Sequence, residues 1–164
     1  MRLGGPANAR RSVVGQALSE FALVVPIFLL LLFGLIEVGR YIYLNNAFNA
    51  AAREGARFGS VEEWKYACPK NVGSPNRITC TEQVTRDRIA GAPASFEVDA
   101  TCTQVGANGS QRAVSAAACG ANDLLTVKIY TPASGPNAYH FLTPIIGQLI
   151  GSPVIAGQAQ VVVQ

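Results

Sequence analysis

An uncharged apolar run close to the N-terminus constrains this chain more than any other feature. Residues 21–36 are sixteen consecutive positions without a charged or strongly polar side chain. A helix over this run is about 24 Å long, shorter than the roughly 30 Å hydrocarbon core of a bilayer. The helix becomes long enough if Ala17, Leu18 and the residues from 37 to 44 are also partly immersed, which places Tyr41 and Tyr43 at the far interface. The run therefore predicts one membrane-spanning segment at about residues 21–43.

The excess positive charge lies entirely in the first fifteen residues. The chain carries 13 Lys and Arg against 10 Asp and Glu, and Arg2, Arg10 and Arg11 precede residue 16 without any acid. The remainder therefore has no net charge, which argues against a nucleic-acid partner. Positive residues before a span favour the cytoplasmic side of the membrane. We predict a basic, flexible leader peptide over residues 1–15, with the N-terminus inside the inner membrane and the C-terminal domain outside.

The rest of the chain divides into a helix and a small domain. Residues 16–60 favour helix throughout, and Pro26 should kink the helix or loosen one turn rather than end it. Residues 61–164 predict an exported α+β domain. Within it we expect a helix over residues 82–90 that is capped by Thr81 and closed by Gly91. We expect strands over residues 96–102, 125–130 and 155–163, a loop over 103–122, and a doubtful helix over 141–150.

Four cysteines follow the apolar run, at positions 68, 80, 102 and 119. None forms a Cys-x-x-Cys pair, so a zinc site is disfavoured and two disulfides in an oxidising compartment are the better interpretation. We favour Cys68–Cys80 and Cys102–Cys119, because each pair brackets a polar, turn-rich loop. Four free buried thiols are the alternative.

A glutamate stands at the mouth of the apolar helix. Gly15 ends the basic leader, Gln16 follows, and Glu20 and Phe21 come directly before the run. An acid carried toward the bilayer centre costs up to about 2.5–3.5 kcal/mol, so Glu20 is a functional candidate by default. The alternative is an unpartnered acid in the headgroup layer.

These residues resemble the processing site of type IV prepilin-like proteins, in which a prepilin peptidase cleaves after the glycine. Residues 15–26, 34–40 and 49–59 together resemble the TadE-like family, minor pilins or pseudopilins of the tight-adherence (Flp) pilus. The resemblance implies a pilin-like fold, a mature chain that begins at Gln16, and Glu20 as its fifth residue. It also implies other pilins, pilus-assembly membrane proteins and the peptidase as partners, beside the lipid bilayer. By this likeness the protein lies in the inner membrane or enters a pilus.

Small residues recur every four positions beyond the span, at Ala47, Ala51, Gly55 and Gly59. Such a stripe lets another backbone approach closely. It could pack on the chain's own C-terminal domain or on a helix of another subunit. Glu37 and Arg40 could pair near the outer interface or form a solvated helix rim.

The sequence favours a structural protein that helps to assemble or prime a pilus, with no catalytic residues, cofactor or metal. One alternative is a secreted protein, such as a hydrolase, cut by signal peptidase after residues 50–52. Glu37 and Arg40 would then lie between the apolar region and the cut, which is atypical. A second alternative is a signal-anchored envelope protein that is never processed.

Overall fold

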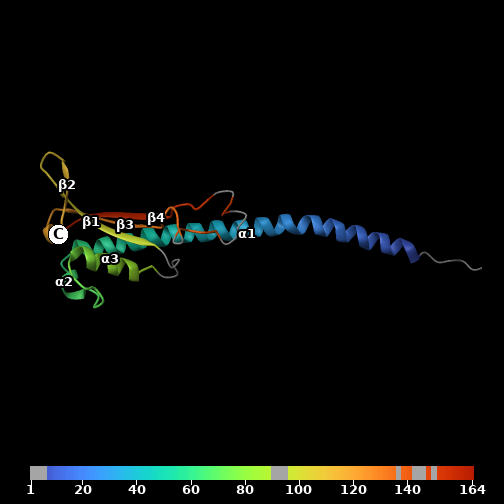
Figure 1. Ribbon diagram of the computed structural model, residues 1–164, viewed down its shortest axis with the longest axis horizontal. Helices are drawn as coiled ribbons and strands as arrows, with labels where there is room; N and C mark the ends of the chain where they lie inside the picture. Colours follow the sequence, from blue (N-terminus) through green and yellow to red (C-terminus); the bar gives the residue numbers. More distant parts are fainter. Residues whose placement is uncertain (1–6, 90–95, 136–137, 142–146, 149–150) are drawn as a thin grey trace, which may run out of the picture. The chain divides into compact units, whose positions relative to one another are not determined.

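The computed structural model describes residues 7–89, 96–135, 138–141, 147–148 and 151–164, and only the backbone of residues 7–14. Its two compact units are Met1–Gly39 and Arg40–Gln164, here called the N-terminal and C-terminal units. Helix α1 (Ala7–Ser60) contributes to both (Figure 1).

The N-terminal unit is helical from Ala7 onward. The flexible leader expected over residues 1–15 is therefore wrong for residues 7–15, because no glycine or proline interrupts residues 7–14 and a helix propagates readily once formed. Pro26 lies inside α1 without ending it, as predicted. Within the part of the chain that the structure describes, one helical segment, Gly15–Ser60, is long and apolar enough to cross a membrane. The apolar side chains over residues 21–36 are largely exposed, with Leu23 and Leu35 each at 72%.

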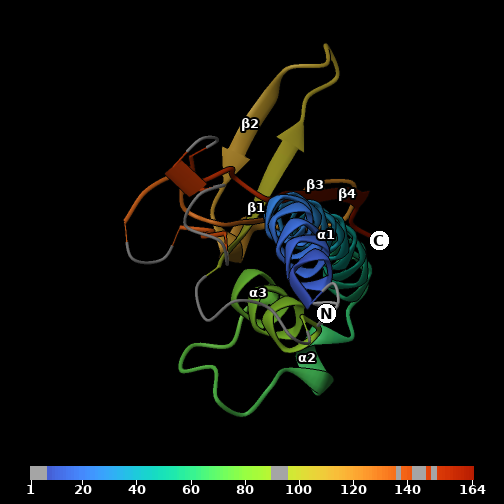
Figure 2. The same ribbon diagram turned by 90° about the vertical axis from the view of Figure 1, so that its right-hand side faces the viewer.

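The C-terminal unit is built on a four-stranded antiparallel sheet in the order β2-β1-β3-β4. The strands are β1 (Glu97–Val105), β2 (Gln111–Val114), β3 (Leu124–Tyr130) and β4 (Ala156–Val162). Along β1, Val98, Ala100 and Cys102 are buried while the residues between them are exposed. The second half of α1 and helix α3 (Arg77–Asp87) lie on the same side of this sheet (Figure 2). The predicted α+β fold is confirmed.

The core lies between α1 and the sheet. Phe48 and Ala52 of α1 are fully buried, as are Leu125, Val127 and Ile129 of β3. These residues belong to one buried cluster, in which the central strand β3 packs against α1. The predicted strands over residues 96–102, 125–130 and 155–163 correspond to β1, β3 and β4.

Two predicted elements need correction. The helix expected over residues 82–90 begins at Arg77, because Asn76 caps it: its side chain accepts from the Thr79 N–H, and Thr79 Oγ1 accepts from the Asn76 N–H. Thr81 is therefore inside α3, and its hydroxyl donates to Arg77 O. Gly91 lies outside the described residues, as do most of residues 141–150.

The loop expected over residues 103–122 instead contains β2 and the short helix η1 (Ala116–Ala118). Strand β1 continues to Val105, and a tight turn then reverses the chain, with Gly109 at a positive φ of 75°. The Gly106 N–H donates to Ser110 O at 2.8 Å and closes the hairpin. Helix α2 (Trp64–Ala67) was also not expected from the sequence.

The C-terminal end of α1 is tied to the domain by a buried arginine. The last carbonyls of a helix lack partners inside it. Here Arg77 Nη1 donates to Gly59 O at 2.5 Å and to Val61 O at 3.3 Å, and the Gln164 N–H donates to Ser60 O at 2.8 Å. The Arg77 guanidinium stacks on Trp64, 5.7 Å from the ring centroid, and burial lowers its pKa.

A glycine in β4 sets the distance between the sheet and α1. A Cβ placed on Gly157 would lie 2.5 Å from the backbone carbonyl carbon of Phe48 and 2.6 Å from the backbone nitrogen of Asn49. A glycine inside a strand often marks such a close approach. Because both atoms belong to helix backbone, they cannot give way as a side-chain tip can.

Gly157→Ala should therefore lower the free energy of unfolding by about 1–3 kcal/mol, the range for overpacking. Gly120→Ala is the matched control, since nothing lies within 4 Å of a Cβ there. Urea unfolding of the full chain in detergent, followed by Trp64 fluorescence, measures both variants. Equal unfolding midpoints for Gly157→Ala and the unaltered chain would contradict this packing.

Candidate assembly site on the N-terminal helix

Glu20 lies exposed on α1, about one helical turn after Gln16 and directly before the apolar run. The Gln16 side-chain Nε2 donates to Glu20 Oε1 at 3.1 Å, and Ser19 Oγ donates to Gln16 O at 2.7 Å. The backbone nitrogen of Gln16 is four residues from Glu20, so both occupy the same helical face. An α-amine made at Gln16 would start one turn away from a carboxylate that already has an amide beside it.

The residues around Glu20 are uncovered in the single chain. Phe21 is 67% exposed and Leu18 is 63% exposed, and the apolar side chains after them remain uncovered as well. Such a surface has a large free-energy penalty in water and requires lipid or other apolar helices around it. Glu20 therefore stands at the edge of a surface that is built to be covered.

Gly15 is an exposed residue inside α1, and no atom lies within 4 Å of a Cβ placed there. Glycine inside a helix is less favourable than alanine by roughly 1 kcal/mol. The helix is therefore locally easier to unwind at the peptide bond between Gly15 and Gln16. A peptidase that needs an extended backbone would unwind the helix more easily at Gly15 than at an alanine.

Two residues of the small-residue stripe on α1, Gly55 and Gly59, pack against α3 within the C-terminal unit. A Cβ on Gly55 would overlap Thr85 Oγ1, and one on Gly59 would overlap Thr81 Oγ1. Both threonines project from α3, and the Thr85 hydroxyl donates to Thr81 O. Gly55 and Gly59 thus let α3 lie directly on α1.

The other half of the stripe is more open. Ala51 is buried and Ala47 is half-buried, and both line a shallow hollow of about 370 Å³ together with Tyr43, Glu54 and Arg88. Glu54 pairs with Arg57 at 3.6 Å and with Arg88 at 3.9 Å on the rim of this hollow. Exposed ion pairs of this kind contribute little to stability.

Glu37 is a buried acid. It is only 2% exposed, so the solvated helix rim considered for Glu37 and Arg40 does not hold for it.

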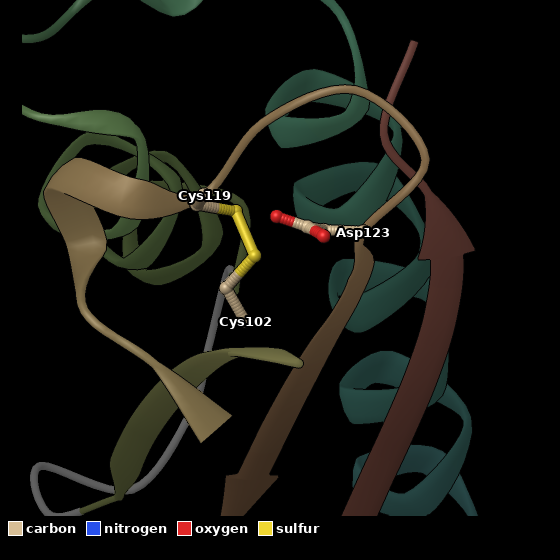
Figure 3. Close-up of side chains that lie close together, drawn as sticks. All are labelled: Cys102, Cys119 and Asp123. Carbon is tan, nitrogen blue, oxygen red and sulfur yellow. A yellow bond between two sulfur atoms is a disulfide. The ribbon is translucent and has the colours of Figure 1, made fainter. Parts of the chain in front are cut away.

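Both disulfides join sequence neighbours, Cys68 with Cys80 and Cys102 with Cys119. A disulfide that closes a loop of this length stabilises a fold by about 3 kcal/mol in the chain-entropy model. Figure 3 shows Asp123 directed toward the Cys102–Cys119 bond, with one ligand atom from each residue within 4.8 Å of the others. Metal ligation requires thiolates, and these sulfurs are bonded to each other. Asp123 Oδ2 instead accepts from the Gly120 N–H at 2.9 Å.

The segment with Gly15, Glu20 and the small-residue stripe is similar to a known protein family. The model of the TadE-like protein family matches residues 15–57. Residues 15–57 are similar to the TadE-like family. The match begins at Gly15, includes Glu20 and Phe21, and ends inside the small-residue stripe. No curated protein and no solved structure shows significant similarity to the chain.

The similarity to the TadE-like family suggests a protein associated with the Tad pilus. Its apolar helix is a candidate membrane anchor.

Proposed function

We propose that this TadE-like chain is a minor pilin or pseudopilin that helps to assemble or prime a Tad/Flp-type pilus. The observation that carries the proposal is Glu20, an exposed acid five residues after Gly15 at the start of an uncovered apolar helix. The family match over residues 15–57 supports it. The protein acts through assembly rather than catalysis.

Processing is the first step of the proposed function. The basic leader holds the N-terminus in the cytoplasm, and α1 crosses the inner membrane so that the C-terminal domain lies outside. A prepilin peptidase then hydrolyses the bond between Gly15 and Gln16. This cut removes Arg2, Arg10 and Arg11 and leaves a new α-amino group on Gln16.

Pairing of charges is the second step. The new amine of an incoming subunit meets the Glu20 carboxylate of its neighbour as their apolar helices pack together. Each charge alone is costly in a low-dielectric surrounding, whereas a matched pair offsets part of that cost. The requirement for a partner favours the correct axial register between subunits. The exposed apolar surface of residues 21–36 supplies the attraction through packing and lipid exclusion.

Deletion of the gene tests the assignment to a pilus. Cells that lack this protein should lose surface pili and the adhesion that depends on them, since a priming subunit acts before elongation. Electron microscopy of the cell surface measures the pili, and re-expression of the full chain is the control. Pili of unchanged number and length in the deletion strain would contradict the proposed role.

A further inference from the structure

An arginine and three aromatic rings cluster where α1 leaves the apolar segment. The Arg40 guanidinium lies 5.0 Å from the Tyr139 ring centroid, and Arg40 Nη1 donates to His140 O at 3.3 Å. Tyr139 contacts Tyr41 edge-to-face at 6.4 Å and Phe141 edge-to-face at 5.5 Å. Residues 138–141, which follow β3 along the chain, are thereby held against one short stretch of α1.

The depth of this cluster follows from the length of the span. A hydrocarbon core of roughly 30 Å takes about 20 helical residues, which places its outer boundary near Arg40 if Phe21 lies at the inner boundary. The headgroup layer beyond is roughly 5–7 Å thick, which corresponds to about four more helical residues. His140, which is hydrogen-bonded to Arg40, would then lie at the same level as residues 40–43.

The chemistry of the exposed side chains suits that level. Ile42 is 52% exposed, Tyr43 is 57% exposed, and the His140 side chain is exposed as well. Aromatic rings and arginine side chains that combine an apolar body with a polar end are favoured in the layer between hydrocarbon and water. Stacking on Tyr139 offsets part of the solvation that the Arg40 guanidinium loses in this layer.

We propose that residues 40–43, His140 and Phe141, held in place by the buried Tyr139, form a lipid-binding surface that seats the C-terminal domain in the headgroup layer of the membrane. This inference rests on the proposed membrane anchoring of α1. The occupant is lipid rather than a protein subunit, because residues 40–43 come directly after the apolar segment in the sequence and pair aromatic rings with an arginine. The domain is then held against the bilayer at its base while it awaits incorporation.

Fluorescence quenching in vesicles tests this surface, and the single tryptophan of the chain supplies an internal control. Trp64 lies beside Arg77, which binds the carbonyl of Gly59, about 28 Å along the helix from Arg40. Full-length protein is reconstituted in phosphatidylcholine and phosphatidylglycerol vesicles that carry a nitroxide either on the headgroup or deep in the acyl chain. Trp64→Phe then provides a background for single tryptophans at His140 and at Phe28.

His140→Trp should lose fluorescence mainly to the headgroup nitroxide, Phe28→Trp mainly to the acyl-chain nitroxide, and native Trp64 to neither. Quenching of Phe28→Trp without quenching of His140→Trp would overturn the lipid-binding surface while leaving the anchor intact. Absence of quenching at Phe28 would instead contradict the membrane anchor itself. Native disulfides and far-UV circular dichroism establish that each variant is folded.

A second pair of measurements asks whether Arg40 holds the segment in place. Arg40→Met keeps a long side chain but removes the stack on Tyr139 and the hydrogen bond to His140 O. In the His140→Trp background it should reduce quenching by the headgroup nitroxide. Arg53→Met, an exposed arginine farther along α1, is the control and should leave quenching unchanged. Equal quenching in both variants would overturn the anchoring role of Arg40.

Discussion

Replacing Gly15 with leucine should leave the uncut 164-residue precursor in the membrane. The bond after Gly15 lies inside α1, so the peptidase must first unwind this turn and extend it. Leucine stabilises the helix relative to glycine by roughly 1 kcal/mol and adds a bulky side chain directly before the bond. Both effects act against cleavage, and neither touches the span that inserts the protein.

Gly34→Leu is the matched control for this variant. Gly34 lies in the same helix, and as at Gly15 no atom lies within 4 Å of a Cβ placed there. Its substitution should leave processing unchanged. Immunoblots and intact-mass measurement of membrane fractions distinguish precursor from mature chain. A mature N-terminus at Gln16 in the Gly15→Leu protein would rule out this processing site.

Glu20→Gln should separate assembly from processing. The glutamine keeps the size of the side chain and an oxygen that can still accept the hydrogen bond from Gln16 Nε2. Insertion should survive because a neutral amide is easier to immerse. Cleavage should survive because the bond lies before Gln16. Incorporation should fail, since the neighbour's new ammonium would be left without a counter-charge.

The expected loss is large. Removing one partner of a buried ion pair costs about 3–5 kcal/mol, which is at least about a hundredfold in an equilibrium for incorporation. Glu54→Gln is the control, because Glu54 is an acid on the same helix whose ion pairs are with Arg57 and Arg88 on the rim of the hollow. Co-purification with other pilus components measures both variants. Processed Glu20→Gln protein at the wild-type level in the assembly would show that charge pairing is not the mechanism.

The parts of this fold that could be predicted depend on local patterns. The apolar run of residues 21–36 predicts an apolar helix that is a candidate membrane span, and the alternation over residues 97–102 specifies a half-buried strand. The two disulfides also follow local loops. The start of α3 was missed because Thr81 and Asn76 are both acceptable caps, and only Asn76 has Thr79 three residues later to complete a capping box.

The parts that could not be predicted depend on contacts between distant segments. Arg77 binds the end of α1 from eighteen residues away, and Arg40 holds a segment 100 residues later. No periodicity encodes either contact. Gly157 did carry a signal, since glycine within an apolar strand suggests a close backbone approach, but the partner was unknown. The sequence alone shows that Glu20 follows Gly15 by five residues. Only the structure shows that the apolar side chains after Glu20 are exposed.

Determination of the N-terminus by mass spectrometry of the protein from its native membrane tests the central claim most directly. We predict a mature chain that begins at Gln16, with Glu20 as its fifth residue and no trace of Arg10 or Arg11. The same measurement on cells that lack prepilin peptidase should return the full precursor. A wild-type chain that keeps its leader, or one that begins after residues 50–52, would contradict processing after Gly15 and the pilin assignment built on it.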